Sequence, residues 1–119
     1  DDYLTTAEGK SLPVPHCIKG TVGHKLYGGL ADALKGKLCF EKNTFPSLEM
    51  AKYLEGKDFD TIELCGLVSN ICVLSNAVMA KSACPNSEII VDSSLTAAAD
   101  EEIHQKSLDV MKGLFIKVL

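Results

Sequence analysis

The fold of this chain is indicated by residues 61–73, TIELCGLVSNICV. The first seven of these residues are largely apolar, which predicts a buried strand over 61–67. Small and polar residues then interrupt the apolar run, and apolar residues at helical spacing follow, which predicts a helix over 71–82. The stretch therefore predicts a strand that turns directly into a helix, with Cys72 at the opening of that helix.

Cys72 is a candidate nucleophile. The start of a helix carries backbone N–H groups without helical partners and the positive end of the helix dipole, and both favour the ionised form of a thiol. Cysteine is also common in protein interiors, where it behaves as a small apolar residue. The turn by itself leaves both interpretations of Cys72 open.

Helical and strand-like segments alternate along most of the chain. Strands are predicted over 37–40, 61–67, 88–91 and 114–118, and helices over 46–54, 71–82 and 100–112. Residues 22–34 include adjacent glycines among their apolar positions and predict a loop with one short helix. An alternating series of this kind requires a parallel sheet joined by crossover helices. We therefore expect an α/β fold, an open three-layer α/β/α sandwich.

Length and charge restrict the class of protein. The chain has 119 residues, of which 46% are hydrophobic, which suits one core and one domain over 1–119. Its 12 basic and 16 acidic side chains leave a net charge of −4, without a basic cluster that could neutralise a run of phosphates. No apolar run approaches the roughly 20 residues of a membrane span, and no apolar leader opens the chain. We expect a cytoplasmic protein that binds neither nucleic acid nor membrane.

The cysteines do not indicate a disulfide framework or a zinc finger. Five of them stand at positions 17, 39, 65, 72 and 84, an odd number without a Cys-x-x-Cys pair. We expect a reducing compartment for the protein, and we expect Cys39 and Cys65 to be buried in strands.

Lys42 is the second candidate catalytic residue. It follows the strand predicted over 37–40, and Cys72 follows the strand predicted over 61–67. In an open parallel sheet, ligands gather beyond the carboxyl ends of the strands, so both side chains are expected at one crevice. An ammonium group close to a thiol favours the thiolate. The alternative for Lys42 is an ordinary solvated surface lysine.

Three segments together resemble a known family. They are residues 13–21, PVPHCIKGT, residues 41–45, EKNTF, and residues 66–73, GLVSNICV. In this order they are similar to segments of the isochorismatase-like cysteine hydrolases, a family that includes the nicotinamidases. The resemblance extends through nearly all 119 residues. It implies an enzyme with a Rossmann-like fold, and it makes this chain the C-terminal portion of the full domain, without the first strand.

The resemblance implies a catalytic triad of aspartate, lysine and cysteine, with Lys42 and Cys72 in the second and third positions. The aspartate belongs to the family's first strand, so we expect it to be missing here. The family also has a cis peptide in the strand-to-helix turn, which would join Leu67 and Val68. The backbone N–H groups of Val68 and Cys72 would then form the oxyanion hole.

His16 is the candidate metal ligand. Nicotinamidases bind a divalent metal with a histidine in a similar Pro-His-Cys segment and with an upstream aspartate and histidine, which are not found here. The resemblance thus implies zinc, iron or manganese in the complete protein, and the alternative is a hydrogen-bonded loop histidine.

Two further positions bear on the substrate. Pro13 stands where nicotinamidases often have an aromatic ring that stacks on the pyridine. Phe45, close to Lys42 in the sequence, is expected to supply an apolar wall of the pocket, and its alternative role is core packing.

The function implied by the resemblance is hydrolysis of the C–N bond of a small carboxamide through a thioester on Cys72. Nicotinamide is the leading candidate for this small-molecule substrate, and a homo-oligomer is expected. Two alternatives are open. The first is an isochorismatase-like hydrolase of a non-amide substrate, and the second is a truncated chain without catalytic activity.

Overall fold

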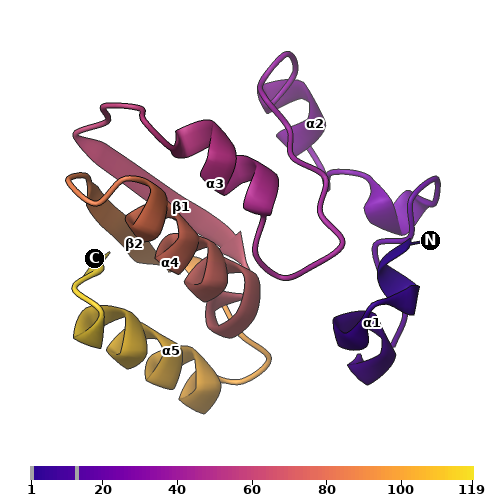
Figure 1. Ribbon diagram of the computed structural model, residues 1–119. Coiled ribbons are helices and arrows are strands. Elements are labelled where there is room, and N and C mark those ends of the chain that lie inside the picture. The colour runs from indigo at the N-terminus through magenta and orange to yellow at the C-terminus, as the bar shows by residue number, and fades with distance from the viewer. Residues whose placement is uncertain (1, 13) are drawn as a thin grey trace. The chain divides into compact units, whose positions relative to one another are not determined.

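The chain divides into two compact units, Asp1–Thr44 and Phe45–Leu119, in a computed structural model that describes residues 2–12 and 14–119 (Figure 1). The first unit consists of short helical segments joined by loops. The second unit contains a sheet and the longer helices. The expectation of one domain over 1–119 stays a prediction.

The first unit has four short helical segments in its described residues. They are η1 (Asp2–Thr5), α1 (Ala7–Ser11), η2 (Val22–His24) and α2 (Leu30–Ala33). The Thr6 hydroxyl caps α1 by accepting a hydrogen bond from the backbone N–H of Gly9 at 3.0 Å. The loop and short helical structure predicted for residues 22–34 agree with η2 and α2.

Residues 37–40, for which the sequence predicts a strand, do not form one. A strand needs a partner for its backbone groups, and the described part of the first unit contains no other strand to pair with. Leu38 keeps 62% of its surface exposed, and Cys39 is exposed as well. The predicted strand and the predicted burial of Cys39 were therefore wrong, because apolar content alone does not supply a pairing partner.

The second unit is built on a parallel sheet. Its described residues form three strands, β1 (Thr61–Leu67), β2 (Glu88–Ala97) and β3 (Lys117–Val118), in the order β1-β2-β3. Both neighbouring pairs are parallel, with Thr61 opposite Glu88 and Ile90 opposite Lys117. The parallel sheet and the α/β class predicted from the sequence are confirmed.

Helices cover one face of this sheet. In the second unit, where every residue is described, the helical segments are α3 (Leu48–Leu54), the π-helical turn η3 (Ser69–Val73), α4 (Leu74–Ala83) and α5 (Glu101–Gly113). α4 connects β1 to β2 and α5 connects β2 to β3, and because such crossovers are right-handed, both helices lie on the same face (Figure 1). α3 packs against α4. None of the helices in the described residues is long and apolar enough to span a membrane.

The hydrophobic core lies between these helices and the sheet. Its buried members include Leu54 from α3, Ala77 from α4, Val91 from β2 and Met111 from α5. Ala77, Val91 and Met111 have no exposed surface. Since one cluster contains side chains from all three helices, the helix layer and the sheet form a continuous packed interior.

β1 buries only one of its faces in the second unit. Ile62 and Leu64 pack against the core, whereas the alternate residues Thr61, Glu63 and Cys65 are exposed. Successive side chains of a strand point to opposite faces, and the helices of this unit cover one of them. The predicted burial of Cys65 was therefore wrong.

β2 is longer than the strand predicted over 88–91 and continues to Ala97. Its pairing with β1 shifts register. Val91 lies opposite Leu64, but Thr96, five positions further along β2, lies opposite Gly66, only two positions further along β1. The polar residues at 92–94 fall in this irregular part, where the Asp92 carboxylate accepts hydrogen bonds from the backbone N–H and hydroxyl of Ser94. Those two bonds hold the pKa of Asp92 below its ordinary value. The polar run thus belongs to an irregularity within the strand.

α5 begins close to its predicted start and is followed by a shorter strand than expected. The Asp100 carboxylate accepts a hydrogen bond from the backbone N–H of Ile103 at 2.9 Å and caps the helix. The helix ends at Gly113, and Phe115 then has a φ of 58°, which is outside the range of a strand. Only two residues of the strand predicted over 114–118 therefore pair with β2.

Candidate active site at the strand-to-helix turn

The turn between β1 and α4 holds the candidate nucleophile. The peptide bond between Leu67 and Val68 is cis, at the position that the family resemblance implies. The carbonyl oxygen of Val68 accepts hydrogen bonds from the backbone N–H groups of Ile71, at 3.2 Å, and Val73, at 3.1 Å. The second of these bonds spans five residues and gives η3 its wide π-helical form.

Cys72 lies inside η3 and is half-buried. Its backbone carbonyl accepts hydrogen bonds from the Asn76 side-chain amide, at 2.8 Å, and from the Ser75 hydroxyl, at 3.3 Å. The cysteine is thus neither enclosed in the core nor on an open strand, unlike the buried Cys84 and the exposed Cys65. Partial exposure leaves the thiol accessible to a small molecule, which a nucleophilic cysteine requires.

The Asn76 side chain links the turn to the segment that precedes α3. Its amide nitrogen donates to the carbonyl of Cys72 and also to the carbonyl of Phe45, at 3.2 Å. Its amide oxygen accepts from the backbone N–H of Ser47, at 2.8 Å, and Ser47 in turn caps α3. Sequence reasoning missed Asn76, because nothing in the helical pattern of residues 71–82 distinguishes this polar position from a solvated one.

Ser69 and His104 form a second link to the turn. The Ser69 hydroxyl oxygen lies 3.0 Å from the Nδ1 atom of His104, which is half-buried on α5. Ser69 has no exposed surface, and its hydroxyl joins the turn to α5. Nothing in the sequence indicates this contact of His104, since no sequence pattern pairs residues 35 positions apart.

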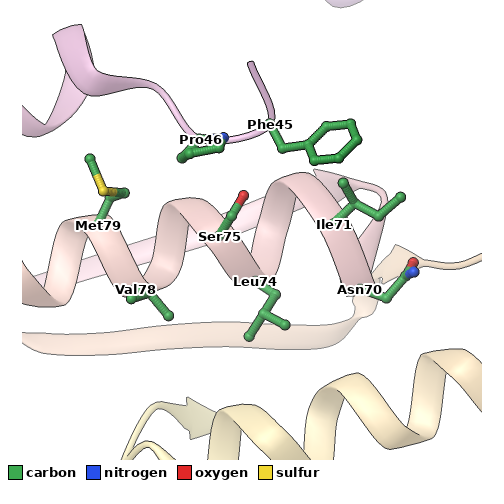
Figure 2. Close-up of a pocket in the computed structure, with 8 residues that line it drawn as sticks. All are labelled: Phe45, Pro46, Asn70, Ile71, Leu74, Ser75, Val78 and Met79. Carbon is green, nitrogen blue, oxygen red and sulfur yellow. The ribbon is translucent and has the colours of Figure 1, made fainter. Parts of the chain in front are cut away.

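An open groove of about 510 Å³ runs along the start of α4 in the second unit (Figure 2). It is lined by Phe45, Pro46, Asn70, Ile71, Leu74, Ser75, Val78 and Met79. Figure 2 shows Phe45 and Pro46 on one side, opposite Ile71, Ser75 and Met79 on the helical side. Phe45, the expected pocket wall, therefore lines a mainly apolar groove beside the turn.

Lys42 belongs to the first unit. Its ammonium group donates a hydrogen bond to the carbonyl of Thr44 at 3.1 Å, and its side chain is exposed. Next to it, Glu41 forms an ion pair with Lys19. The hydrogen bond from Lys19 and its charge, with a smaller effect of His24, hold the pKa of Glu41 below its ordinary value. Lys42 and Cys72 lie in different units, so their meeting at one crevice stays a prediction.

His16 is an exposed loop residue. Its Nδ1 atom lies 2.9 Å from the carbonyl oxygen of Val14, and its backbone N–H donates to the Tyr3 hydroxyl at 2.7 Å. Within residues 2–12 and 14–119, no group of three His, Cys, Asp or Glu side chains could hold a metal ion. The described residues alone therefore hold no complete metal site, and a metal bound by His16 in the complete protein stays a prediction. Pro13 lies outside the described residues.

Several solved structures share this fold, and the three described here are named nicotinamidase or pyrazinamidase. A pyrazinamidase/nicotinamidase from Streptococcus mutans is 31% identical, with a TM-score of 0.78 over 95% of this chain and 66% of that one. A nicotinamidase/pyrazinamidase from Bacillus subtilis is 27% identical, with a TM-score of 0.77 over 94% of this chain and 65% of that one. A pyrazinamidase of Pyrococcus horikoshii in complex with zinc is 20% identical, with a TM-score of 0.73 over 98% and 67%, and shows the shared fold alone.

The chain spans a little under two thirds of the length of the first two of these structures, 66% and 65%. No curated protein sequence matches it. The sequence model of the isochorismatase domain matches residues 2–119. Because this match includes nearly every residue, and because the fold agrees, the chain belongs to the isochorismatase family.

Proposed function

We propose that this protein is a cysteine hydrolase that cleaves the C–N bond of a small carboxamide through a thioester on Cys72. The observation that carries the proposal is the place of Cys72, half-buried in the helical turn between β1 and α4. Membership of the isochorismatase family and likeness to enzymes named nicotinamidase support the same class of reaction.

The proposed reaction has two steps at one sulfur atom. The thiolate of Cys72 attacks the carbonyl carbon of the amide, and the C–N bond breaks as the nitrogen takes up a proton and leaves as ammonia. The product is an acyl thioester. A water molecule then attacks the thioester carbon, the C–S bond breaks, and the carboxylic acid leaves while the thiol is restored.

Four further groups take part in the proposed reaction. The backbone N–H groups of Val68 and Cys72 would stabilise the negative oxygen of each tetrahedral intermediate, an interaction worth about 3 kcal/mol per donor in other hydrolases. Lys42 would stabilise the thiolate. The proton for ammonia would come from the aspartate that the family resemblance implies in a preceding strand.

The first substrates to test are nicotinamide and pyrazinamide, because the similar solved structures carry the names nicotinamidase and pyrazinamidase. A flat aromatic amide also suits an apolar wall such as Phe45, which lines the groove beside the turn.

The test measures ammonia released from these amides by the protein that includes the preceding strand with its aspartate, and by variants of that protein. Cys72→Ala is expected to lower kcat by about three orders of magnitude or more, because it removes the nucleophile. Lys42→Ala is expected to lower kcat about a hundredfold. Cys65→Ala is the matched control, since it removes an exposed thiol from β1 and is expected to leave the rate unchanged.

Two results would contradict the proposal. If Cys72→Ala kept the wild-type rate, the reaction would not use this thiol, and the non-amide hydrolase would become the better explanation. If the protein that includes the preceding strand released no ammonia from any carboxamide while Cys72 still reacted with iodoacetamide, a chain without catalytic activity would be the better explanation.

A further inference from the structure

We infer that Asn76 is a positioning residue that fixes the Phe45–Ser47 segment against the turn carrying Cys72. This inference rests on the proposed function, because it explains how the nucleophile and the apolar wall beside it are held together. Asn76 would not touch the substrate, and it would act through the backbone of Cys72 and Phe45.

The contacts of Asn76 use both ends of its amide group. The nitrogen donates to the carbonyl of Cys72 at 2.8 Å and to that of Phe45 at 3.2 Å. The oxygen accepts from the backbone N–H of Ser47 at 2.8 Å. An asparagine amide offers two N–H donors and one carbonyl acceptor, so three bonds occupy both donors and the acceptor atom.

Only one of these bonds lies within the helical segment. The bond to Cys72 spans four residues, whereas the bonds to Phe45 and Ser47 span 31 and 29 residues. Asparagine is a poor residue for a helix interior, because its amide competes with the backbone for hydrogen bonds. Here the amide forms hydrogen bonds with Phe45 and Ser47, which lie far from α4 in the sequence. A good helix former such as alanine could not form these bonds.

The segment that Asn76 holds contains one wall of the groove beside the turn and the cap of α3. Phe45 lines the groove beside the turn, and Ser47 caps α3 by accepting from the N–H of Met50 at 3.2 Å. Both are therefore fixed relative to Cys72 by one side chain. A displacement of the order of 1 Å between a nucleophile and the wall that orients its substrate costs an enzyme about a hundredfold in rate.

Three substitutions separate the long-range link from the bond inside the helix. Asn76→Asp keeps an acceptor for Ser47 but removes the N–H groups that reach Cys72 and Phe45. Asn76→Val has a similar size and no polar group. Asn76→Thr keeps a hydroxyl that can bond to the carbonyl four residues earlier, which is that of Cys72, but cannot replace the bonds to Phe45 and Ser47.

Asn86→Asp is the matched control, because it makes the same chemical change at an exposed position in the same unit. The experiment measures alkylation of individual cysteines by iodoacetamide with peptide mass spectrometry, together with kcat and KM for nicotinamide. Cys65 is exposed, so its alkylation reports the reactivity of the reagent itself. Cys84 is buried, so its alkylation reports global unfolding. A local change at the turn should alter Cys72 alone.

We expect all three Asn76 variants to alkylate Cys72 about threefold faster or more, while Cys84 stays protected, because the turn opens locally. We expect kcat to fall at least about tenfold, since positioning is lost, and Asn86→Asp to match the wild type in every measurement. A faster thiol in a slower enzyme is the signature of lost positioning.

Three outcomes would overturn the inference. The first is an Asn76→Thr variant that matches the wild type, because the bond inside the helix would then suffice. The second is Cys72 and Cys84 accelerating together in every variant, which would show a role in global stability. The third is unchanged alkylation and kcat with a lower melting temperature. If the wild type hydrolyses no amide, the proposed function fails, and the alkylation pattern alone still decides the role of Asn76.

Discussion

At the scale of single residues, the end of β1 depends on the backbone of Gly66. Its φ is 110°, in the range that favours glycine, and it lies opposite Thr96 at the register shift of the sheet. A Cβ atom at this position would meet nothing within 4 Å, so space does not require glycine. The requirement comes from backbone conformation alone. The chain can leave β1 and enter the turn because this residue has no side chain.

The first prediction compares two glycines that differ in φ. Gly66→Ala should lower the free energy of unfolding by about 1–3 kcal/mol, because alanine is strained at positive φ. The added Cβ of Gly113→Ala also meets open space, but residue 113 is helical. This substitution is therefore expected to raise the free energy of unfolding by about 0.4–1 kcal/mol. Urea unfolding followed by circular dichroism measures both. Equal effects of the two substitutions would show that φ is not the cause.

At the scale of elements, the turn is held from two sides. Asn76 of α4 connects it to the segment before α3, and Ser69 connects it to His104 of α5. The contacts of Asn76 with Phe45 and Ser47, and of Ser69 with His104, join residues 29 to 35 positions apart, so they exist only when the second unit is folded. The position of Cys72 is therefore a property of three helices together and not of the turn alone.

The next prediction concerns the link between α5 and the turn. In a double-mutant cycle, Ser69→Ala and His104→Ala should show a coupling of about 0.5–1.5 kcal/mol in the free energy of unfolding, the usual worth of one hydrogen bond. Ser82→Ala with His104→Ala is the control pair, because the exposed Ser82 hydroxyl bonds within its own helix to Val78. Additive effects in the first cycle would contradict the link.

At the scale of the whole chain, stability of the second unit depends on the core that its helices share with the sheet. Met111 and Val91 are completely buried there, and Ile89 and Ile116 are nearly so. The core is on the covered face of the sheet, while the exposed residues of β1 contribute nothing to it. Apolar burial on one face thus supports both the sheet and the turn at its end.

A further prediction tests this core. Met111→Ala should lower the free energy of unfolding by about 2–5 kcal/mol, because it removes a fully buried side chain and leaves a cavity. Val110→Ala is the control, since Val110 is the neighbouring residue and is 51% exposed. Denaturant titrations of both variants give the comparison. A core role for Met111 would be contradicted if the two changes cost the same.

The local patterns of the second unit were readable in the sequence. The strand over 61–67 has the predicted bounds, and the acidic start of the helix predicted over 100–112 is the capped beginning of α5. Both signals are local, because alternation of apolar segments and capping residues act within a few positions. The cysteine in the turn followed from the same local pattern.

What the sequence by itself determined is therefore the series of elements in residues 46–118, the parallel sheet and the turn that holds Cys72. Only the tertiary structure decided that residues 37–40 form no strand and that Cys65 faces outward. It alone also revealed that Asn76 and His104 hold the turn. The physical reason is range: periodicity and capping act between near neighbours, whereas pairing, burial and hydrogen bonds to distant segments depend on which surfaces meet in the folded chain.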